Sequence, residues 1–152
     1  MNEANTTTPR DERQHYRSIF WAAYEVFCCK CTASTPAMLP DGTYEPGGPH
    51  DPAWERWSRW RSDFQLCGEE ILHGEQRFIF SRHMCRPEGD EKHLSVRQAI
   101  EQIQIDYGSG SIGMNLFYST KQIIAEKVGA ELERRGVWPV CDYMRYTPGE
   151  VA

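Results

Sequence analysis

The chain has 152 residues, of which 39% are hydrophobic and 26% are charged, a balance typical of one globular domain. Its formal net charge of −5 argues against a surface that is cationic throughout, because unselective binding to polyanions comes mainly from Lys and Arg. The acidic excess lies in the first half: residues 1–71 carry 7 Lys/Arg and 11 Asp/Glu, whereas residues 72–140 carry 9 of each kind.

The N-terminal segment indicates where the protein works. The first ten residues are polar and lack the apolar stretch of a secretory signal, so we expect a cytoplasmic protein. The apolar run 19–29 is interrupted by Glu25 and is too short to span a bilayer, so we expect no membrane partner. Residues 1–9 predict a disordered tail, and residues 10–152 predict a single helical domain.

The first predicted helix is aromatic on one face. Apolar residues from Tyr16 to Phe27 recur at helical spacing, which predicts a helix that begins near Asp11 and stops near Lys30. Residues 32–50 contain proline and glycine at a density that neither helix nor sheet tolerates. They predict a long surface loop.

A second helix is predicted after Asp51 and Pro52, because the Asp side chain can accept an N–H group of the first turn and proline has none to leave unpaired. Its predicted core-facing stripe is Ala53, Trp57, Trp60, Phe64, Cys67 and Ile71. The segment WERWSRWR, residues 54–61, also interleaves tryptophan with arginine, which suits either base stacking or a protein interface. With two tryptophans in the stripe, the residues left for protein binding are Trp54, Arg56 and Arg59.

The remaining elements also predict helices. His73 and Gly74 mark a break, after which an apolar pattern continues to Arg86. Ser95 is a predicted N-cap for a short helix, with Leu94 packing ahead of it.

After the glycine-rich break 106–113, a long helix is expected to end before Gly136, and the tail 137–152 is expected to pack back as a strap. The predicted buried face of this last helix is Phe117, Ile124, Val128 and Leu132, with Lys121 burying only its stem. The predicted fold class is therefore all-α, with about five helices in one domain.

The chemistry-bearing residues do not predict an enzyme. The six cysteines are Cys28, Cys29, Cys31, Cys67, Cys85 and Cys141. Cys28 and Cys31 have the spacing of a zinc-ligand pair, and His83 with Cys85 or Cys67 could complete a site, but the pair lies at the end of a predicted helix and the cluster as a whole does not match the known zinc knuckles. We therefore predict thiols that hold no metal, and no cofactor. The sequence has no nucleophile elbow, Walker loop, dinucleotide fingerprint or HExxH motif.

Residues 72–135 carry the segments GEQRFIFSRHM, LSVRQAIEQI and YSTKQIIAEKVGAEL in that order. This order resembles phage and prophage regulators built on a helix-turn-helix similar to sigma-factor region 4, some of them antiterminator-like. The resemblance implies a small DNA-binding transcriptional regulator whose last helix enters the major groove. It places Tyr118, Ser119, Thr120, Lys121 and Gln122 near bases, with Arg97, Lys127, Arg134 and Arg135 towards the phosphate backbone.

A second hypothesis stays open beside it. The chain could instead be a non-enzymatic protein-binding inhibitor or adaptor of phage origin that uses its acidic N-terminal half and Trp54. In either case host transcription machinery or another protein is a candidate partner. The charge map separates the two hypotheses: a contiguous positive surface containing Arg97, Lys121 and Arg134 favours DNA, and exposed aromatic residues beside an acidic face favour a protein.

Overall fold

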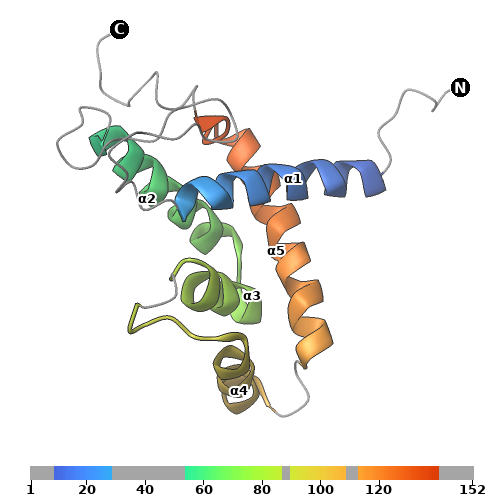
Figure 1. Ribbon diagram of the computed structural model, residues 1–152. Coiled ribbons are helices and arrows are strands. Elements are labelled where there is room, and N and C mark those ends of the chain that lie inside the picture. The colour runs from blue at the N-terminus through green and yellow to red at the C-terminus, as the bar shows by residue number, and fades with distance from the viewer. Residues whose placement is uncertain (1–8, 29–53, 87–89, 109–112, 141–152) are drawn as a thin grey trace, which may run out of the picture.

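The computed structural model describes residues 9–28, 54–86, 90–108 and 113–140, and within these ranges it has helices and turns but no strand (Figure 1). The all-α fold class is confirmed. The helices are α1 (Pro9–Phe27), α2 (Trp54–Ile71), α3 (Gly74–Ile79), the π-helical segment η2 (Phe80–Met84), α4 (Val96–Tyr107) and α5 (Met114–Arg134).

Helix α5 is the axis of the molecule and packs against α1, α2, α3 and α4. In Figure 1, α1 runs across the C-terminal half of α5, α2 lies beside the C-terminal end of α1, and α4 lies at the opposite end, near the start of α5. None of the described helices combines the length and the apolar character needed to cross a lipid bilayer.

An aromatic cluster from α1, α2 and η2 forms the centre of the core. The Phe64 ring lies 4.8 Å from the Phe27 ring, 5.6 Å from Trp60, 5.8 Å from Phe20 and 6.0 Å from Phe80, measured between centroids. All five side chains are buried. The predicted stripe of α2 is confirmed at Trp57, Trp60, Phe64 and Cys67, which are buried, and at Ile71, which is partly buried.

The crossing of α1 and α5 depends on Gly129. A Cβ atom at this position would lie 2.0 Å from the backbone oxygen of Tyr16, so only glycine lets the two backbones approach so closely. Two polar contacts join the helices near the crossing: Arg13 pairs with Glu126 at 3.7 Å, and His15 Nε2 lies at hydrogen-bond distance, 3.0 Å, from Glu133.

The segment after α2 contains a wide helical turn. The backbone N–H of Cys85 donates to the oxygen of Phe80 at 2.8 Å, five residues earlier, whereas an α-helix would join residues four apart. This spacing buries two apolar pairs five residues apart, Ile79 with Phe80 and Met84 with Cys85. The predicted break at His73 and Gly74 is confirmed, since α2 ends at Ile71 and α3 begins at Gly74.

Both ends of the C-terminal helical pair follow their sequence signals. Ser95 accepts from the backbone N–H of Gln98, and the Gln98 side chain accepts from the N–H of Ser95, which completes a capping box for α4. Gly136, with φ of 73°, follows the end of α5. The first residues of the predicted strap pack back on α2, because Val137 and Val140 are buried and the indole N–H of Trp60 donates to the Val137 oxygen at 2.7 Å.

Several predictions concern parts of the chain outside the described residues. These are the tail before Pro9, the loop 32–50, the cap at Asp51 and Pro52, and the strap beyond Val140.

Candidate functional site

The residues that the resemblance assigns to DNA are distributed over α4, α5 and the residue that follows α5. Arg97, Tyr118, Ser119, Gln122 and Lys127 are exposed. Gln122 contributes to a groove beside α1, and the Lys127 ammonium donates to the Gln76 side chain on α3 at 2.9 Å. Of these side chains, Arg97 lies on α4 and the others lie on α5.

Two members of the predicted set point inward. Thr120 is 8% exposed, and its hydroxyl donates to the Leu116 oxygen at 2.7 Å. Lys121 is half-buried, with its Nζ atom 3.4 Å from Nε2 of His83. Burial lowers the pKa of Lys121. Lys121 therefore contacts His83 within the protein, besides any contact that it makes with a ligand.

The two arginines at the end of α5 are held by carboxylates. Arg134 forms a bidentate pair with Glu131, and Arg135 donates to Glu131 at 2.7 Å and to Glu70 on α2 at 2.5 Å. These hydrogen bonds, the Arg134 one foremost, lower the pKa of Glu131 to about 2, so its carboxylate stays charged. At 1.5 Å per residue, Arg134 is roughly 24 Å along the helix from Tyr118.

His83 and Lys121 form the best-defined polar contact between the helical pair and η2. The imidazole Nδ1 lies 2.8 Å from the Leu94 oxygen, which requires a proton on Nδ1 and leaves Nε2 to accept from Lys121. The His93 ring stacks at 5.6 Å and the Phe117 ring meets it edge-on at 5.3 Å. Burial, opposed by the Leu94 bond and helped by the charges of Lys121 and His93, lowers the pKa of His83.

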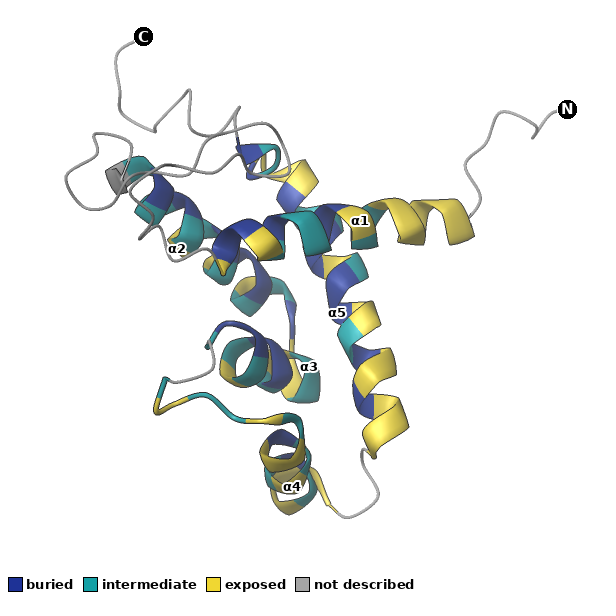
Figure 2. Ribbon diagram, viewed as in Figure 1, coloured by how far each residue is buried: buried dark blue, intermediate teal, exposed yellow. Residues whose placement is uncertain are grey.

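Large apolar side chains are exposed on the last turn of α4 and on the first half of α5. We call this set the apolar end; it consists of Ile105, Tyr107, Met114, Leu116, Tyr118 and Ile123. Ile105 is 76% exposed because it lies opposite the side of α4 that buries Ala99 and Ile103. Figure 2 shows exposed residues on both helices in this region. Met114 and Tyr118 lie on one flank of α5, and Leu116 and Ile123 on the other. Single exposed apolar residues are ordinary, but several on neighbouring helices are a feature of interaction surfaces.

A groove of about 560 Å³ lies next to the apolar end, between α1 and α5. Its lining residues are Arg10, Gln14, Arg17, Ser18, Trp21 and Gln122, of which the first five lie along one flank of α1. Neither Arg10 nor Arg17 forms an ion pair within the part of the chain that the structure describes. Met114, Tyr118 and Gln122 are four residues apart and so form a strip of α5 that joins the groove to the apolar end.

The predicted protein-binding residues lie at the start of α2, away from this region. Trp54 begins the helix, but its side chain falls outside the described residues. Arg56 and Arg59 are half-buried, and each already has an interaction partner. Whether these three residues bind a protein stays a prediction.

The cysteines that the structure describes are free thiols. Cys28 is exposed, whereas Cys67 and Cys85 are buried. Burial raises the pKa of Cys67 to about 12, and it raises the pKa of Cys85 as well, so both are neutral near pH 7. Within the described ranges no three His, Cys, Asp or Glu side chains are grouped so that they could hold a metal ion. Cys29, Cys31 and Cys141 lie outside these ranges.

Comparison with known proteins adds no relative. No protein-family model, curated protein or solved structure matches the chain. Function is therefore inferred from the chemistry of the surface.

Sequence reasoning missed both parts of this surface. The groove has a signal in the sequence, since Arg10, Gln14, Arg17 and Trp21 recur at helical spacing on one side of α1. Ile105 also has one, because it falls opposite the apolar face of its helix. The other five residues of the apolar end have no such signal, because their exposure depends on which parts of α4 and α5 the neighbouring helices cover.

Proposed function

We propose that the chain is a non-enzymatic protein-binding module, in which the apolar end receives an apolar segment of another protein. The observation that carries the proposal is the exposure of six large apolar side chains on the last turn of α4 and the first half of α5. Burying aliphatic and aromatic groups in this way is the main source of affinity between proteins. It offers little to a DNA backbone, for which cations are needed.

The charge beside the apolar end specifies the partner further. Arg10 and Arg17 line the adjacent groove without an ion pair in the described part of the chain, and Trp21 contributes an aromatic wall. Complementarity therefore favours a segment whose apolar residues are flanked by Asp or Glu, because like charges across an interface oppose binding. An acidic amphipathic peptide is the occupant that fits both parts of the surface.

The test is selection of binders from a random peptide library against the full chain, followed by affinity measurement with labelled peptides. We expect the selected peptides to combine aromatic or aliphatic residues with Asp or Glu. Ile105→Glu and Leu116→Glu should each weaken binding at least about tenfold, because a charge placed in an apolar contact must be desolvated. Leu66→Glu is the matched control, since Leu66 is 50% exposed but lies on α2.

The groove is tested with a second pair of variants. Arg17→Glu should weaken binding of the acidic peptides and leave neutral analogues unaffected, while Arg77→Glu, on the exposed surface of α3, should change neither. Binding that is equally sensitive to the Leu66 variant would contradict the proposal. So would a preference for basic peptides, self-association that Ile105→Glu abolishes, or tight binding of duplex DNA that the same variants block.

A further inference from the structure

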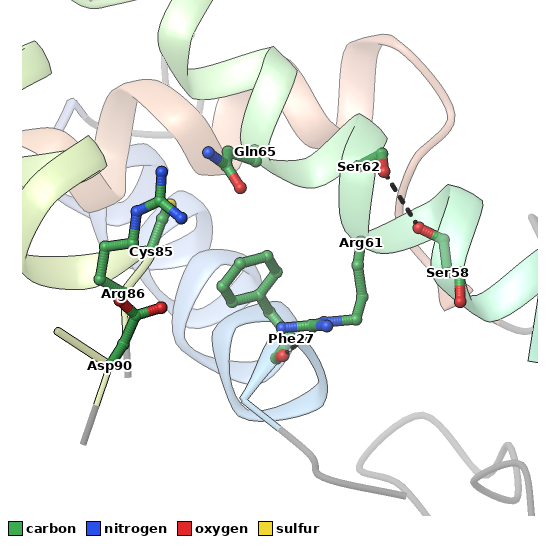
Figure 3. A pocket seen from close by; sticks show the side chains of 8 residues that line it. All are labelled: Phe27, Ser58, Arg61, Ser62, Gln65, Cys85, Arg86 and Asp90. Carbon is green, nitrogen blue, oxygen red and sulfur yellow. Dashed lines mark hydrogen bonds between the residues drawn. The ribbon is translucent and has the colours of Figure 1, made fainter. Parts of the chain in front are cut away.

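A second pocket, separate from the apolar end, lies between the last turn of α1, one flank of α2 and the segment after η2 (Figure 3). Its volume is about 440 Å³. Its lining is mostly polar and carries two guanidinium groups; in Figure 3 that of Arg61 lies against Phe27 and that of Arg86 lies beside Cys85. The lining residues are Phe27, Ser58, Arg61, Ser62, Gln65, Cys85, Arg86 and Asp90.

Arg61 is fixed in place by the helix end that it caps. Its Nε donates to the Phe27 oxygen at 2.9 Å, and its guanidinium carbon lies 4.7 Å from the Phe27 ring centroid and 4.9 Å from that of Trp57. These contacts use the Nε–H group and the faces of the guanidinium plane. The Nη groups make no hydrogen bond or ion pair with the rest of the described chain, so they remain available as donors.

Arg86 has a buried donor whose hydrogen bond is not satisfied by the described residues. Its Nε is buried and has no hydrogen-bond partner among the described residues. Asp90, the one carboxylate among the lining residues, accepts from the backbone N–H of Lys92 at 2.8 Å and forms no ion pair with Arg86. Buried polar groups in folded proteins nearly always have a partner, and a charged donor without one is costly. The described part of the chain therefore leaves this donor of Arg86 without an acceptor.

The remaining lining supports an anion. Ser58, Ser62 and Gln65 lie along one flank of α2, and the Ser62 hydroxyl donates to the Ser58 oxygen at 3.2 Å, as Figure 3 shows. Because its pKa is raised by burial, the Cys85 thiol adds no negative charge near neutral pH. Of the lining residues, Arg61 and Arg86 are cationic and Asp90 is anionic. Behind the lining, the Glu69 carboxylate accepts from the Gln65 amide at 3.0 Å.

We propose that this pocket binds a small molecule through an oxyanion, a phosphate or a carboxylate, held between Arg61 and Arg86. The planar guanidinium presents two parallel N–H groups that match either oxyanion.

The experiment titrates the full chain with inorganic phosphate and, in a parallel arm, with succinate, each against sodium chloride at equal ionic strength. Binding is followed by amide chemical shifts and by the melting temperature, which a ligand selective for the folded state raises. We expect saturable shifts at Arg61, Gln65 and Arg86 with at least one probe. The arm that saturates at the lower concentration identifies the preferred oxyanion.

Arg86→Gln should weaken this binding about tenfold or more, since it removes a charge-assisted donor pair. Arg82→Gln is the matched control, because Arg82 precedes Arg86 by four residues and is exposed, with its guanidinium 5.8 Å from the Phe78 ring. Arg86→Lys keeps the charge without the planar fork and should also bind weakly, which guards against a folding defect in the first variant.

The proposal is overturned if neither probe saturates, if the shifts spread over the exposed arginines, or if Arg86→Gln and Arg82→Gln behave alike. Ile105→Glu should leave phosphate and succinate binding unchanged. The outcome is thus independent of whether the apolar end binds a protein.

Discussion

Trp60 links the core to the chain that follows α5. Its side chain is fully buried, and its indole N–H reaches the Val137 oxygen 77 residues further along at 2.7 Å. Trp60→Ala should lower the free energy of unfolding by about 3–5 kcal/mol, because the cavity it leaves fills only in part. Trp60→Phe should cost less, about 1–3 kcal/mol, since a ring remains while the Val137 oxygen loses its donor.

Urea denaturation followed by circular dichroism measures both variants. A loss below about 1 kcal/mol for Trp60→Ala would mean that the stripe of α2 does not form the core. Equal losses for the two variants would assign the whole effect to the hydrogen bond.

His83 makes stability depend on pH. Its folded pKa lies below the ordinary value, because burial and the facing charges of Lys121 and His93 outweigh its bond to Leu94. The unfolded chain therefore binds the proton more readily. Stability from this group is present above about pH 6.5, the ordinary histidine pKa, and it falls as pH drops below that value until the folded pKa is reached.

His83→Gln should remove part of this pH dependence, because it removes the imidazole whose pKa burial lowers. The measurement is the midpoint of urea unfolding at several values between about pH 5 and 8, where ordinary histidine titrates. An unchanged slope in the His83 variant would contradict the assignment.

Gly129 sets how closely α1 and α5 approach. Alanine usually favours a helix over glycine by about 1 kcal/mol, so Gly129→Ala would stabilise an isolated α5. In the folded chain the added Cβ would meet the Tyr16 backbone oxygen at 2.0 Å. Backbone atoms yield less easily than side chains, and we expect a net loss of about 1–3 kcal/mol.

The matched comparison for Gly129 is its neighbour. Ala130 is only partly buried, and Ala130→Gly should cost about 1 kcal/mol through propensity alone. Thermal unfolding of both variants separates the effects: a stabilised Gly129→Ala variant would mean that α1 does not cross α5 at this point.

The elements that the sequence predicted well are those whose signals are local. The stripe of α2 depends on spacing along one helix, and the Ser95 cap depends on Gln98 three residues later. The π-helical turn of η2 was not predicted, because no residue type specifies a bond from Cys85 to Phe80. Only the pairing of buried residues five apart indicates it, and that pattern also fits an irregular loop.

The candidate sites were harder to predict because they arise between elements. Lys121 was expected to bury its stem, and its contact with His83 joins residues 38 positions apart. The pocket that Arg61 and Arg86 line forms where α2 lies next to the segment after η2. In the sequence, each arginine alone is indistinguishable from an ordinary solvated surface arginine. Likewise, the exposure of Leu116 and the burial of Phe117 follow from the position of α5 in the whole molecule.

Charge across the whole molecule bears on the DNA hypothesis. The chain carries a net charge of −5, and the structure distributes the predicted DNA-binding cations among internal partners. Lys121 contacts His83, Lys127 contacts Gln76, and Glu131 holds both Arg134 and Arg135. Among the predicted DNA-binding cations, only Arg97 forms no hydrogen bond or ion pair with another described residue.

We therefore expect weak binding to random duplex DNA with a shallow dependence on salt. Each phosphate neutralised contributes about −0.9 to the slope of log K against log salt, so a single contact by Arg97 gives a slope near −1. Fluorescence anisotropy of a labelled duplex between about 50 and 200 mM salt measures the slope. A much steeper slope, reduced by Lys121→Ala and by Arg134→Ala, would instead support a DNA-binding surface on α5.

Glu131→Gln provides the internal control for this measurement. It removes the carboxylate that holds Arg134 and Arg135, and the pair Arg135–Glu70 remains. Arg134 is then released to contact phosphate, and the salt slope should steepen by about 0.9 for that one contact. If the variant binds duplex no better than the parent chain, pairing with Glu131 is not what limits the affinity for DNA. The weak binding is then explained by the position of Arg134, which lies too far along α5 from Tyr118 for both to contact one site.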